Sequence, residues 1–276
     1  MSNTTVTFIG GGNMARSLIA GLIADDHEPT AIRVAEPDAT KCQQLTSHFG
    51  VTASADTSAM VAEARVLVLC VKPQMAPDVC RALAAQLPAA APLVISVMAG
   101  VTAASLEAWL GRPVPLVRAM PNTPALVQSG AIGLYANAQA SAEQRNLAEE
   151  ILRAGGVTQW VDSEAAIDAV TALSGSGPAY FLLLMEAMER AGIQQGLEAE
   201  AARLLTIQTA LGTARLAMES TESPAALRAR VTSPGGTTER AIAHFEAAGF
   251  GALVEQAMEA ARQRAAELAH DLHQAG

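Results

Sequence analysis

The sequence predicts an α/β protein in which a doubly wound, mostly parallel β-sheet precedes an all-α region. Three observations support this prediction. Short apolar strands alternate with helices up to Asp162, a glycine-rich turn joins the first strand to the first helix, and the pattern is helical throughout after Asp162. Strand–helix alternation is typical of parallel sheets that carry helices on both faces. The expected domains are therefore residues 1–162 and residues 163–276.

Runs of aliphatic and β-branched residues mark the strands of the first domain. We expect them at residues 5–9, 31–38, 64–71, 93–100, 114–120, 131–135 and 158–161. Helices are expected at residues 15–23, 40–48, 57–63, 75–86, 103–110 and 142–153. The run at 64–71 is so apolar that both faces of this strand should be buried, as in a parallel sheet.

The second domain is expected to hold helices at residues 164–173, 178–195, 198–220, 224–230, 238–247 and 250–272. Its segment 179–188 is apolar nearly all round, which is typical of a helix buried on every side. A helical domain of this size cannot easily bury such a helix alone. We therefore expect a second subunit to cover it, so that the second domain serves dimerisation.

Composition excludes several classes of partner. The net charge is −9, which argues against binding to nucleic acid or to an acidic membrane. Three cysteines without a C-x-x-C spacing indicate neither a disulfide framework nor a zinc site, and no metal is expected. We find neither signal-peptide features nor an uninterrupted apolar run long enough to span a membrane, so a cytoplasmic location is expected.

The turn after the first strand reads G-x-G-x-x-A, with Gly10, Gly12 and Ala15 at the fixed positions. The chemistry requires Gly10 for a tight turn and Gly12 for close approach of the backbone to a pyrophosphate. Ala15 lets the following helix lie close to the strand. Because a strand precedes this motif and a helix follows it, the motif predicts a Rossmann-like domain that binds NAD(P).

Two further strand ends should lie near this cofactor. Glu36 and Pro37 end the second strand, where an acidic residue accepts hydrogen bonds from the ribose hydroxyls of NAD and repels the 2′-phosphate of NADP. Lys72 follows the third strand, and ligands of such sheets bind at the carboxyl ends of the strands. Arg33 could offset the repulsion by Glu36, so NADH and NADPH both remain open as cofactors.

Two loops of the second domain, at residues 173–180 and 231–240, combine glycines, hydroxyl groups and a proline near a helix start. Backbone N–H groups at a helix start attract anions, and Thr237 or Thr238 can cap a helix that begins near Glu239. Neither helix-start turn supplies a histidine or lysine to act as a strong base. An iminium substrate already carries its proton and needs only orientation, a carboxylate site and a hydrogen bond to nitrogen. Thr238, Ser174 or Ser176 could make that bond.

Five segments resemble the pyrroline-5-carboxylate reductase family. They occur in the family's order and span nearly the whole chain. The last two are highly specific, whereas the glycine motif alone is much less so. The matching segments are Phe8-Ile9-Gly10-Gly11-Gly12-Asn13-Met14-Ala15, Val71-Lys72-Pro73-Gln74, Met120-Pro121-Asn122-Thr123-Pro124, residues 168–180 and residues 231–238.

The resemblance implies NAD(P)H-dependent reduction of 1-pyrroline-5-carboxylate to L-proline, the last step of proline biosynthesis. It also implies a homodimer or a multiple of dimers, including decamers. Cofactor contacts carried over by motif fall on Gly10, Gly11, Gly12, Asn13, Met14, Ala15, Val71, Lys72, Pro73, Met98, Ala99, Met120, Pro121 and Asn122. Substrate contacts fall on Ser233, Gly235, Gly236, Thr237 and Thr238, with Ser174, Gly175, Ser176 and Gly177 close by. Thr238 is the best candidate for the catalytic hydrogen bond to the imine nitrogen.

Departures from the family pattern keep alternatives open. Many members carry Asn-Arg-Ser or a similar run after the second strand, and this chain has Glu36-Pro37-Asp38 there, which permits NADH. A hydroxyacid dehydrogenase would place a lysine on the first long helix of its helical domain, and no lysine follows Lys72. A non-catalytic nucleotide sensor would not need the two polar loops. A reductase of six-membered cyclic imines is not distinguished by these motifs.

Overall fold

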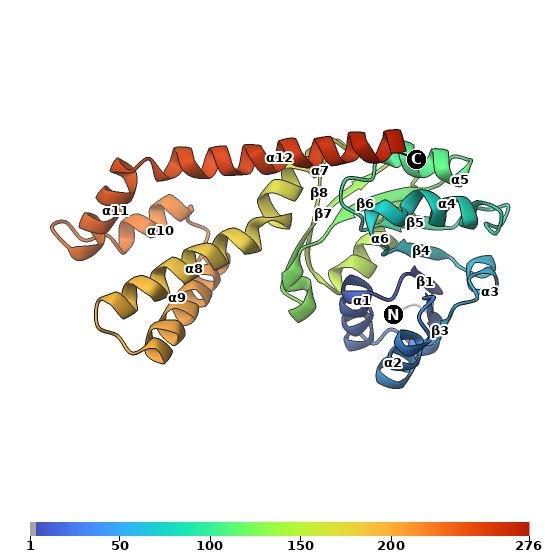
Figure 1. The fold of residues 1–276 in the computed structure, drawn as a ribbon, viewed down its shortest axis with the longest axis horizontal. Helices are drawn as coiled ribbons and strands as arrows, with labels where there is room; N and C mark the ends of the chain where they lie inside the picture. Colours follow the sequence, from blue (N-terminus) through green and yellow to red (C-terminus); the bar gives the residue numbers. More distant parts are fainter. Residues whose placement is uncertain (1–3, 276) are drawn as a thin grey trace. The chain divides into compact units, whose positions relative to one another are not determined.

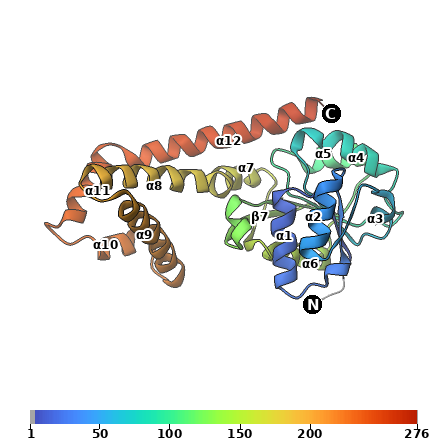
Figure 2. The same cartoon turned by 60° about the horizontal axis from the view of Figure 1, so that its bottom comes forward.

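The computed structural model describes residues 4–275 of the chain. The chain separates into two compact units. The first comprises the chain up to Ser176 and again from Ala260 onward, and the second comprises Gly177–Glu259. Each unit is described separately below, and Figures 1 and 2 show their elements in two views.

The first unit is built on one eight-stranded sheet. Its strands are β1 (Val6–Ile9), β2 (Ile32–Ala35), β3 (Thr52–Ser54), β4 (Val66–Leu69), β5 (Leu93–Ser96), β6 (Leu116–Met120), β7 (Gly130–Ala136) and β8 (Gly156–Trp160). Its α-helices are α1 (Asn13–Ala24), α2 (Ala39–Phe49), α3 (Ser58–Ala62), α4 (Ala76–Ala84), α5 (Ala103–Leu110), α6 (Ala142–Arg153) and α7 (Ala166–Val170). Short helical turns are η1 (Pro29–Ala31), η2 (Pro73–Met75), η3 (Thr123–Val127) and the π-helix η4 (Thr171–Gly175).

The order of the strands in the sheet is β3-β2-β1-β4-β5-β6-β7-β8. Every neighbouring pair is parallel except β6 and β7, which confirms the predicted doubly wound, mostly parallel sheet. The chain adds strands on one side of β1 and then crosses to β4 on its other side. The β1–β4 boundary is therefore the switch point, where ligands of such sheets bind.

Alternate residues of the buried strands point to opposite faces of the sheet, so each face has its own core. On β4, Val66 and Val68 belong to one core, which includes residues of α1 and α6. Leu67 and Leu69 belong to the other core, which includes residues of α4 and α5. The near-continuous apolar run of this strand is thus buried on both sides, as expected. Figures 1 and 2 show helices on both faces of the sheet.

Polar residues at the helix starts fix the boundaries of the helices. The Asp38 carboxylate accepts hydrogen bonds from the backbone N–H groups of Thr40 and Lys41 and so caps α2. Ser141 and Gln144 form a reciprocal capping box at the start of α6. Such caps satisfy backbone donors that have no partner within the helix.

The second unit is helical. It contains α8 (Gly177–Gln194), α9 (Ala199–Glu219), α10 (Pro224–Arg230), α11 (Thr237–Ala247) and the first part of α12 (Phe250–Ala275). Large apolar side chains of α8 are exposed in the single chain, including Phe181, Leu182 and Leu183 at 67%, 63% and 67%. The stretch Ala166–Gln194 is even long and apolar enough to cross a membrane by length and composition, which the sequence reading did not anticipate. Only 17% of its apolar window is buried in this chain.

The compact units do not divide at residue 162, where the sequence pattern changes. Helix α7 packs on the sheet, and a Cβ built on Gly133 of β7 would lie 2.5 Å from Val170. The end of α12 also belongs to the first unit, because Leu272 packs against the core beside α4 and α5. The secondary-structure pattern therefore changes at residue 162, earlier in the chain than the boundary between the two compact units after Ser176.

Candidate functional site

The glycine turn has the geometry that the motif requires. Gly10 adopts a φ of 97°, and a Cβ there would lie 2.9 Å from the backbone oxygen of Cys70. Only glycine tolerates this conformation and this close approach at low cost. Gly12 is the N-cap of α1, and a Cβ there would meet no atom within 4 Å. The backbone at Gly12 is therefore open to a ligand, whereas Ala15 is buried beneath it.

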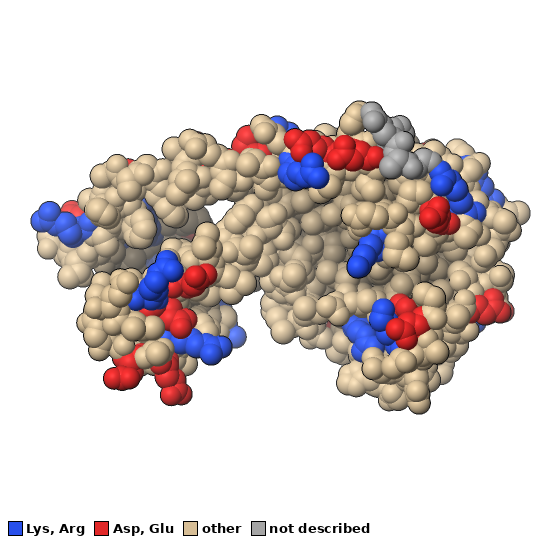
Figure 3. All heavy atoms as spheres, in the orientation of Figure 1, with Lys and Arg blue, Asp and Glu red and all other residues tan. Residues whose placement is uncertain are grey.

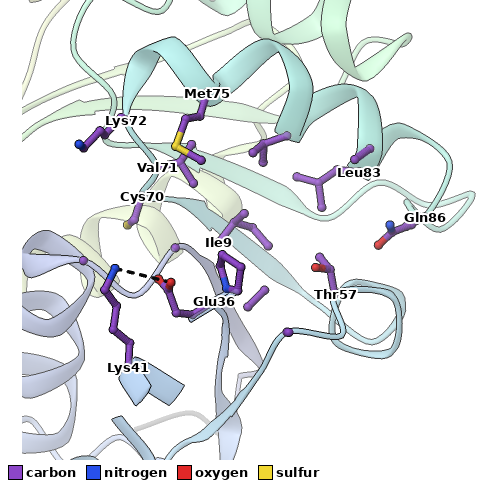
Figure 4. Close-up of a pocket in the computed structure, with 17 residues that line it drawn as sticks. Ile9, Glu36, Lys41, Thr57, Cys70, Val71, Lys72, Met75, Leu83 and Gln86 are labelled. Carbon is purple, nitrogen blue, oxygen red and sulfur yellow. Dashed lines mark ion pairs between the residues drawn. The ribbon is translucent and has the colours of Figure 1, made fainter. Parts of the chain in front are cut away.

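A cavity of about 560 Å³ lies at the carboxyl ends of β1, β2 and β4. Its position is the switch point of the sheet, and Figure 4 shows the side chains around it. The only two lysines of the chain, Lys41 and Lys72, both line it. The lining residues are Ile9, Gly10, Gly12, Ala35, Glu36, Pro37, Lys41, Ala55, Thr57, Cys70, Val71, Lys72, Met75, Val79, Ala82, Leu83 and Gln86.

Glu36 is the acidic residue of this cavity and is only 6% exposed. Its Oε2 accepts a hydrogen bond from the N–H of Gly11 at 2.9 Å, and its Oε1 accepts one from the N–H of Asp38 at 3.1 Å. The Lys41 ammonium lies 3.7 Å from Oε1, as the dashed line in Figure 4 marks. Glu36 therefore holds the glycine turn in shape, a role that sequence reasoning did not assign to it. Its contact with a ribose stays a prediction.

Several lining residues were missed by sequence reasoning. Met75, Val79, Leu83 and Gln86 recur at helical spacing across α4 and the turns on either side of it. That spacing puts them on the same side of the helix. These lining residues could have been identified from the sequence once α4 was placed next to the glycine turn. Thr57 lines the cavity from the loop between β3 and α3, and β3 itself was not predicted.

Some expected cofactor residues lie outside this cavity. Pro73 begins η2, Met98 is buried at 4%, and Ala99 follows it in the loop after β5. Gly11, Asn13 and Met14 belong to the glycine turn and the start of α1 without lining the cavity. Strand β6 ends at Met120, and Pro121 and Asn122 follow it. Their contacts with a cofactor stay predictions.

Asn122 has two protein partners for its side-chain amide. Its Nδ2 donates to the backbone oxygen of Ser174 at 2.9 Å, and its Oδ1 accepts from the N–H of Ala131 at 3.0 Å. Asn122 is 9% exposed. The residue therefore joins the end of β6 to β7 and to the π-helix η4.

The loop at residues 173–177 begins in this π-helix. π-helices are rare and are frequently found at functional sites. The N–H of Ser176 donates to the oxygen of Thr171 at 2.8 Å, and the Ser174 hydroxyl donates to the oxygen of Val170 at 3.1 Å. A Cβ on Gly175 would lie 2.6 Å from the methyl group of Met120, so a larger residue there would require the Met120 side chain to move. Gly177 then begins α8.

The loop at residues 231–238 belongs to the second unit. Its helix α11 starts at Thr237 with Gly236 as N-cap, and no side chain caps it. The expectation that Thr237 or Thr238 caps the helix is therefore wrong, because Gly235, at a φ of 71°, turns the chain one residue earlier. The Glu239 carboxylate reaches back and accepts a hydrogen bond from the N–H of Gly235 at 2.7 Å.

This arrangement leaves the hydroxyl of Thr238 without a hydrogen bond among the described residues, and its side chain is half-buried. Ser233, Gly235 and Thr237 are exposed, and Gly236 is partly buried. The loop therefore presents hydroxyl groups at its surface, as the sequence suggested, whereas the N–H groups of Gly235 and Gly236 already donate to Glu239 and to the backbone oxygen of Ser233.

The distribution of surface charges, the metal-ligating side chains and the protonation of the cysteine thiols further limit the chemistry that the chain can support. Blue and red groups alternate on the face drawn in Figure 3, and no extended field of one sign covers its described residues. Within residues 4–275, no group of three or more metal-ligating side chains is found. Burial raises the pKa of the Cys80 thiol to about 12 and that of the cavity-lining Cys70 thiol further still. Both thiols stay protonated near neutral pH and are poor nucleophiles.

The switch-point cavity, the open glycine turn and the acid at the end of β2 together define an NAD(P)-dependent oxidoreductase with a Rossmann-like domain. A family model described as NADP oxidoreductase, coenzyme F420-dependent, matches residues 5–100. A second model, for pyrroline-5-carboxylate reductase dimerisation, matches residues 164–268.

Known proteins resemble the whole chain. It is 55% identical to the pyrroline-5-carboxylate reductase of Pseudomonas aeruginosa, an alignment that covers 99% of this chain and 100% of the relative. A solved pyrroline-5-carboxylate reductase from Coxiella burnetii has a TM-score of 0.93 at 47% identity, covering 97% of this chain and 99% of that one. The Plasmodium falciparum enzyme, solved with NADP bound, has a TM-score of 0.85 at 26% identity, covering 98% and 99%. The chain belongs to the pyrroline-5-carboxylate reductase family.

Proposed function

We propose that this chain transfers a hydride from NADPH or NADH to the C=N bond of 1-pyrroline-5-carboxylate, giving L-proline in the last step of proline biosynthesis. The observation that carries this proposal is the full-length identity of 55% to a named reductase of this substrate. The absence of a histidine or lysine from the two polar loops agrees with it. An imine substrate, unlike a ketone, can arrive already protonated and needs no strong acid from the enzyme.

The cofactor is assigned to the switch-point cavity and the glycine turn. Gly10–Ala15 would face the pyrophosphate, Glu36 and Pro37 the adenosine ribose, and residues 71–73 the path towards the nicotinamide. Met98, Ala99 and residues 120–122 complete the proposed set at neighbouring strand ends. The bound cofactor supplies the hydride, and the role of the chain is to hold it where the strands end.

The substrate is assigned to the two polar loops. N–H groups of Gly235, Gly236 and Thr237 lie at the start of α11, where the helix dipole favours a carboxylate. The unbonded hydroxyl of Thr238 is the proposed hydrogen-bonding partner of the ring nitrogen. Ser174, Gly175, Ser176 and Gly177 are proposed as the second loop of the substrate site.

The assembly is proposed to be a homodimer or a multiple of dimers, decamers included. The match to the family's dimerisation region and the exposed apolar side chains of α8 support a second subunit over this helix. The apolar stretch Ala166–Gln194 then lies in a subunit interface and not in a membrane. We place the protein in the cytoplasm, without nucleic-acid partners. Light scattering on the purified protein should give a dimer or a multiple of it, and a monomer would contradict this assignment.

A steady-state assay tests the activity. Purified protein should oxidise NADPH or NADH when 1-pyrroline-5-carboxylate is added, and L-proline should accumulate in equal amount. The same assay with the six-membered cyclic imine carboxylate measures ring-size selectivity. If neither cofactor is oxidised with the five-membered substrate, the proposed function is wrong.

A further inference from the structure

The cavity contains one polar atom that the proposed function does not use. Oε1 of Gln86 is buried and has no hydrogen-bond partner among the described residues. Leaving a buried acceptor unpaired costs about 1–3 kcal/mol, so such atoms are rare in folded proteins. Gln86 lines the cavity from the turn that follows α4. A ligand that donates a hydrogen bond there would remove this cost.

The position of Gln86 indicates which part of a dinucleotide meets it. Figure 4 shows Lys72 and Gln86 on opposite sides of the cavity. In the proposed cofactor site, the glycine turn binds the pyrophosphate and Glu36 contacts the ribose of the adenosine half. The adenine ring must therefore lie beyond Glu36, on the side away from Lys72.

That side of the cavity suits a purine. Its walls are apolar and come from Val79, Ala82 and Leu83 of α4. Such walls bury the faces of an aromatic ring, and a few placed polar groups then fix its orientation. Gln86 supplies a polar side chain at this end from the turn after α4, while Thr57 supplies a hydroxyl from the loop after β3.

We infer that Gln86 is a specificity-determining residue that recognises the adenine ring of the cofactor, with its Oε1 accepting a hydrogen bond from the 6-amino group. This inference rests on the cofactor site of the proposed function. A glutamine amide pairs an acceptor with a donor, and the edges of adenine offer the complementary donor and acceptor. The contact selects adenine over bases that carry an oxygen in place of the amino group.

Binding of two reduced dinucleotides tests the inference. The probes are NADH and its hypoxanthine analogue, in which a carbonyl replaces the 6-amino group, titrated without substrate by calorimetry. The unmodified protein should bind the analogue about three- to tenfold more weakly, as expected for one lost hydrogen bond. Gln86→Leu should weaken NADH binding by the same factor and leave binding of the analogue unchanged.

Two further variants sharpen the test. An amide can turn over and offer its NH₂ group to a carbonyl, whereas Gln86→Glu has only acceptors at neutral pH. Gln86→Glu should therefore prefer NADH over the analogue at least as strongly as the unmodified protein does. Gln43→Leu makes the same substitution at an exposed site of α2 outside the cavity, and both affinities should be unchanged.

Equal binding of the two dinucleotides by both the unmodified protein and Gln86→Glu would overturn the role of Gln86. The same holds if the preference for NADH persists in Gln86→Leu. If neither dinucleotide nor NADPH binds, the cofactor site itself is wrongly placed, which separates the failure of the proposed function from the failure of this inference. Binding of the analogue by Gln86→Leu also shows that this variant is folded.

Discussion

The side chain of Asn122 donates a hydrogen bond to the backbone oxygen of Ser174 at 2.9 Å and so ties the end of β6 to the π-helix η4. The two residues lie 52 positions apart in the sequence. The proposed substrate loop thus depends for its position on a residue at the end of a sheet strand. This relationship makes Asn122 a positioning residue for Ser174, Gly175 and Ser176.

Asn122→Asp should raise the KM for the imine substrate more than the KM for the cofactor. Aspartate keeps an oxygen for the N–H of Ala131 but cannot donate to Ser174 when ionised. The lost bond should also lower the free energy of unfolding by about 1–3 kcal/mol. Steady-state kinetics and urea unfolding measure the two effects. Asn146→Asp, at an exposed site of α6, is the control. A rise in the cofactor KM alone would instead place Asn122 against the cofactor.

Thr238→Ala should lower kcat by about three- to tenfold, as expected for one neutral hydrogen bond made to the reacting nitrogen. Cofactor affinity should be unchanged, and Thr238→Ser should restore most of the activity because it keeps the hydroxyl. Thr221→Ala, an exposed site in the same unit, serves as the control. Unchanged kinetics in Thr238→Ala would move the nitrogen contact to another residue.

Glu239→Gln should lower the KM for the substrate by about two- to fivefold. The Glu239 carboxylate holds the N–H of Gly235, which is the group proposed to bind the substrate carboxylate. Removing its charge removes a competing anion, and an anion at a helix start is worth about 0.3–1 kcal/mol. Glu246→Gln makes the same change near the other end of α11 and should have no effect. A higher KM in Glu239→Gln would mean that Glu239 organises the loop.

Glu36→Gln should shift the preference towards NADPH. Glutamine keeps an acceptor oxygen for the N–H of Gly11, so the glycine turn is preserved, while the negative charge near the 2′-position is lost. Lys41 is then free to face a phosphate. We expect the ratio of kcat/KM for NADPH over NADH to rise about fivefold or more, since paired charges near a surface interact by at least 1 kcal/mol. Glu63→Gln, which breaks an exposed ion pair with Arg33, is the control and should leave the ratio unchanged.

Asp168→Asn should stabilise the protein at neutral pH. Burial raises the pKa of the Asp168 carboxyl above its ordinary value of 3.8; nearby Arg118 and Arg262 oppose this and Glu164 adds to it. A folded-state pKa above the unfolded value means that the ionised carboxylate disfavours the folded state, and that this penalty vanishes as the pH falls through the folded pKa. The Tm of Asp168→Asn should therefore exceed that of the unmodified protein at pH 7, with the difference shrinking towards pH 4. A difference that is independent of pH would exclude this cause.

Much of the fold follows from local patterns. The expected helix at 142–153 coincides with α6, because a serine cap and an amphipathic face fix it locally. The strand β3 was missed because Thr52–Ser54 is short and lacks large apolar residues, so that only its pairing with β2 makes it a strand. The cap of α11 was misassigned, since a positive φ at Gly235 ends the turn before the threonines.

The sequence by itself determined the fold class, the glycine turn and the family, because these depend on local periodicity and on residues that are adjacent in the chain. The tertiary structure decided which distant residues meet. Glu36 reaches the N–H of Gly11, Asn122 reaches Ser174, and the turn after α4 brings Gln86 to the cavity. Hydrogen bonds between residues far apart in sequence leave no periodic signal, so only the folded chain reveals them. The loop at residues 231–240 keeps its proposed role as the substrate loop, and the structure shows that the Glu239 carboxylate accepts a hydrogen bond from the N–H of its Gly235.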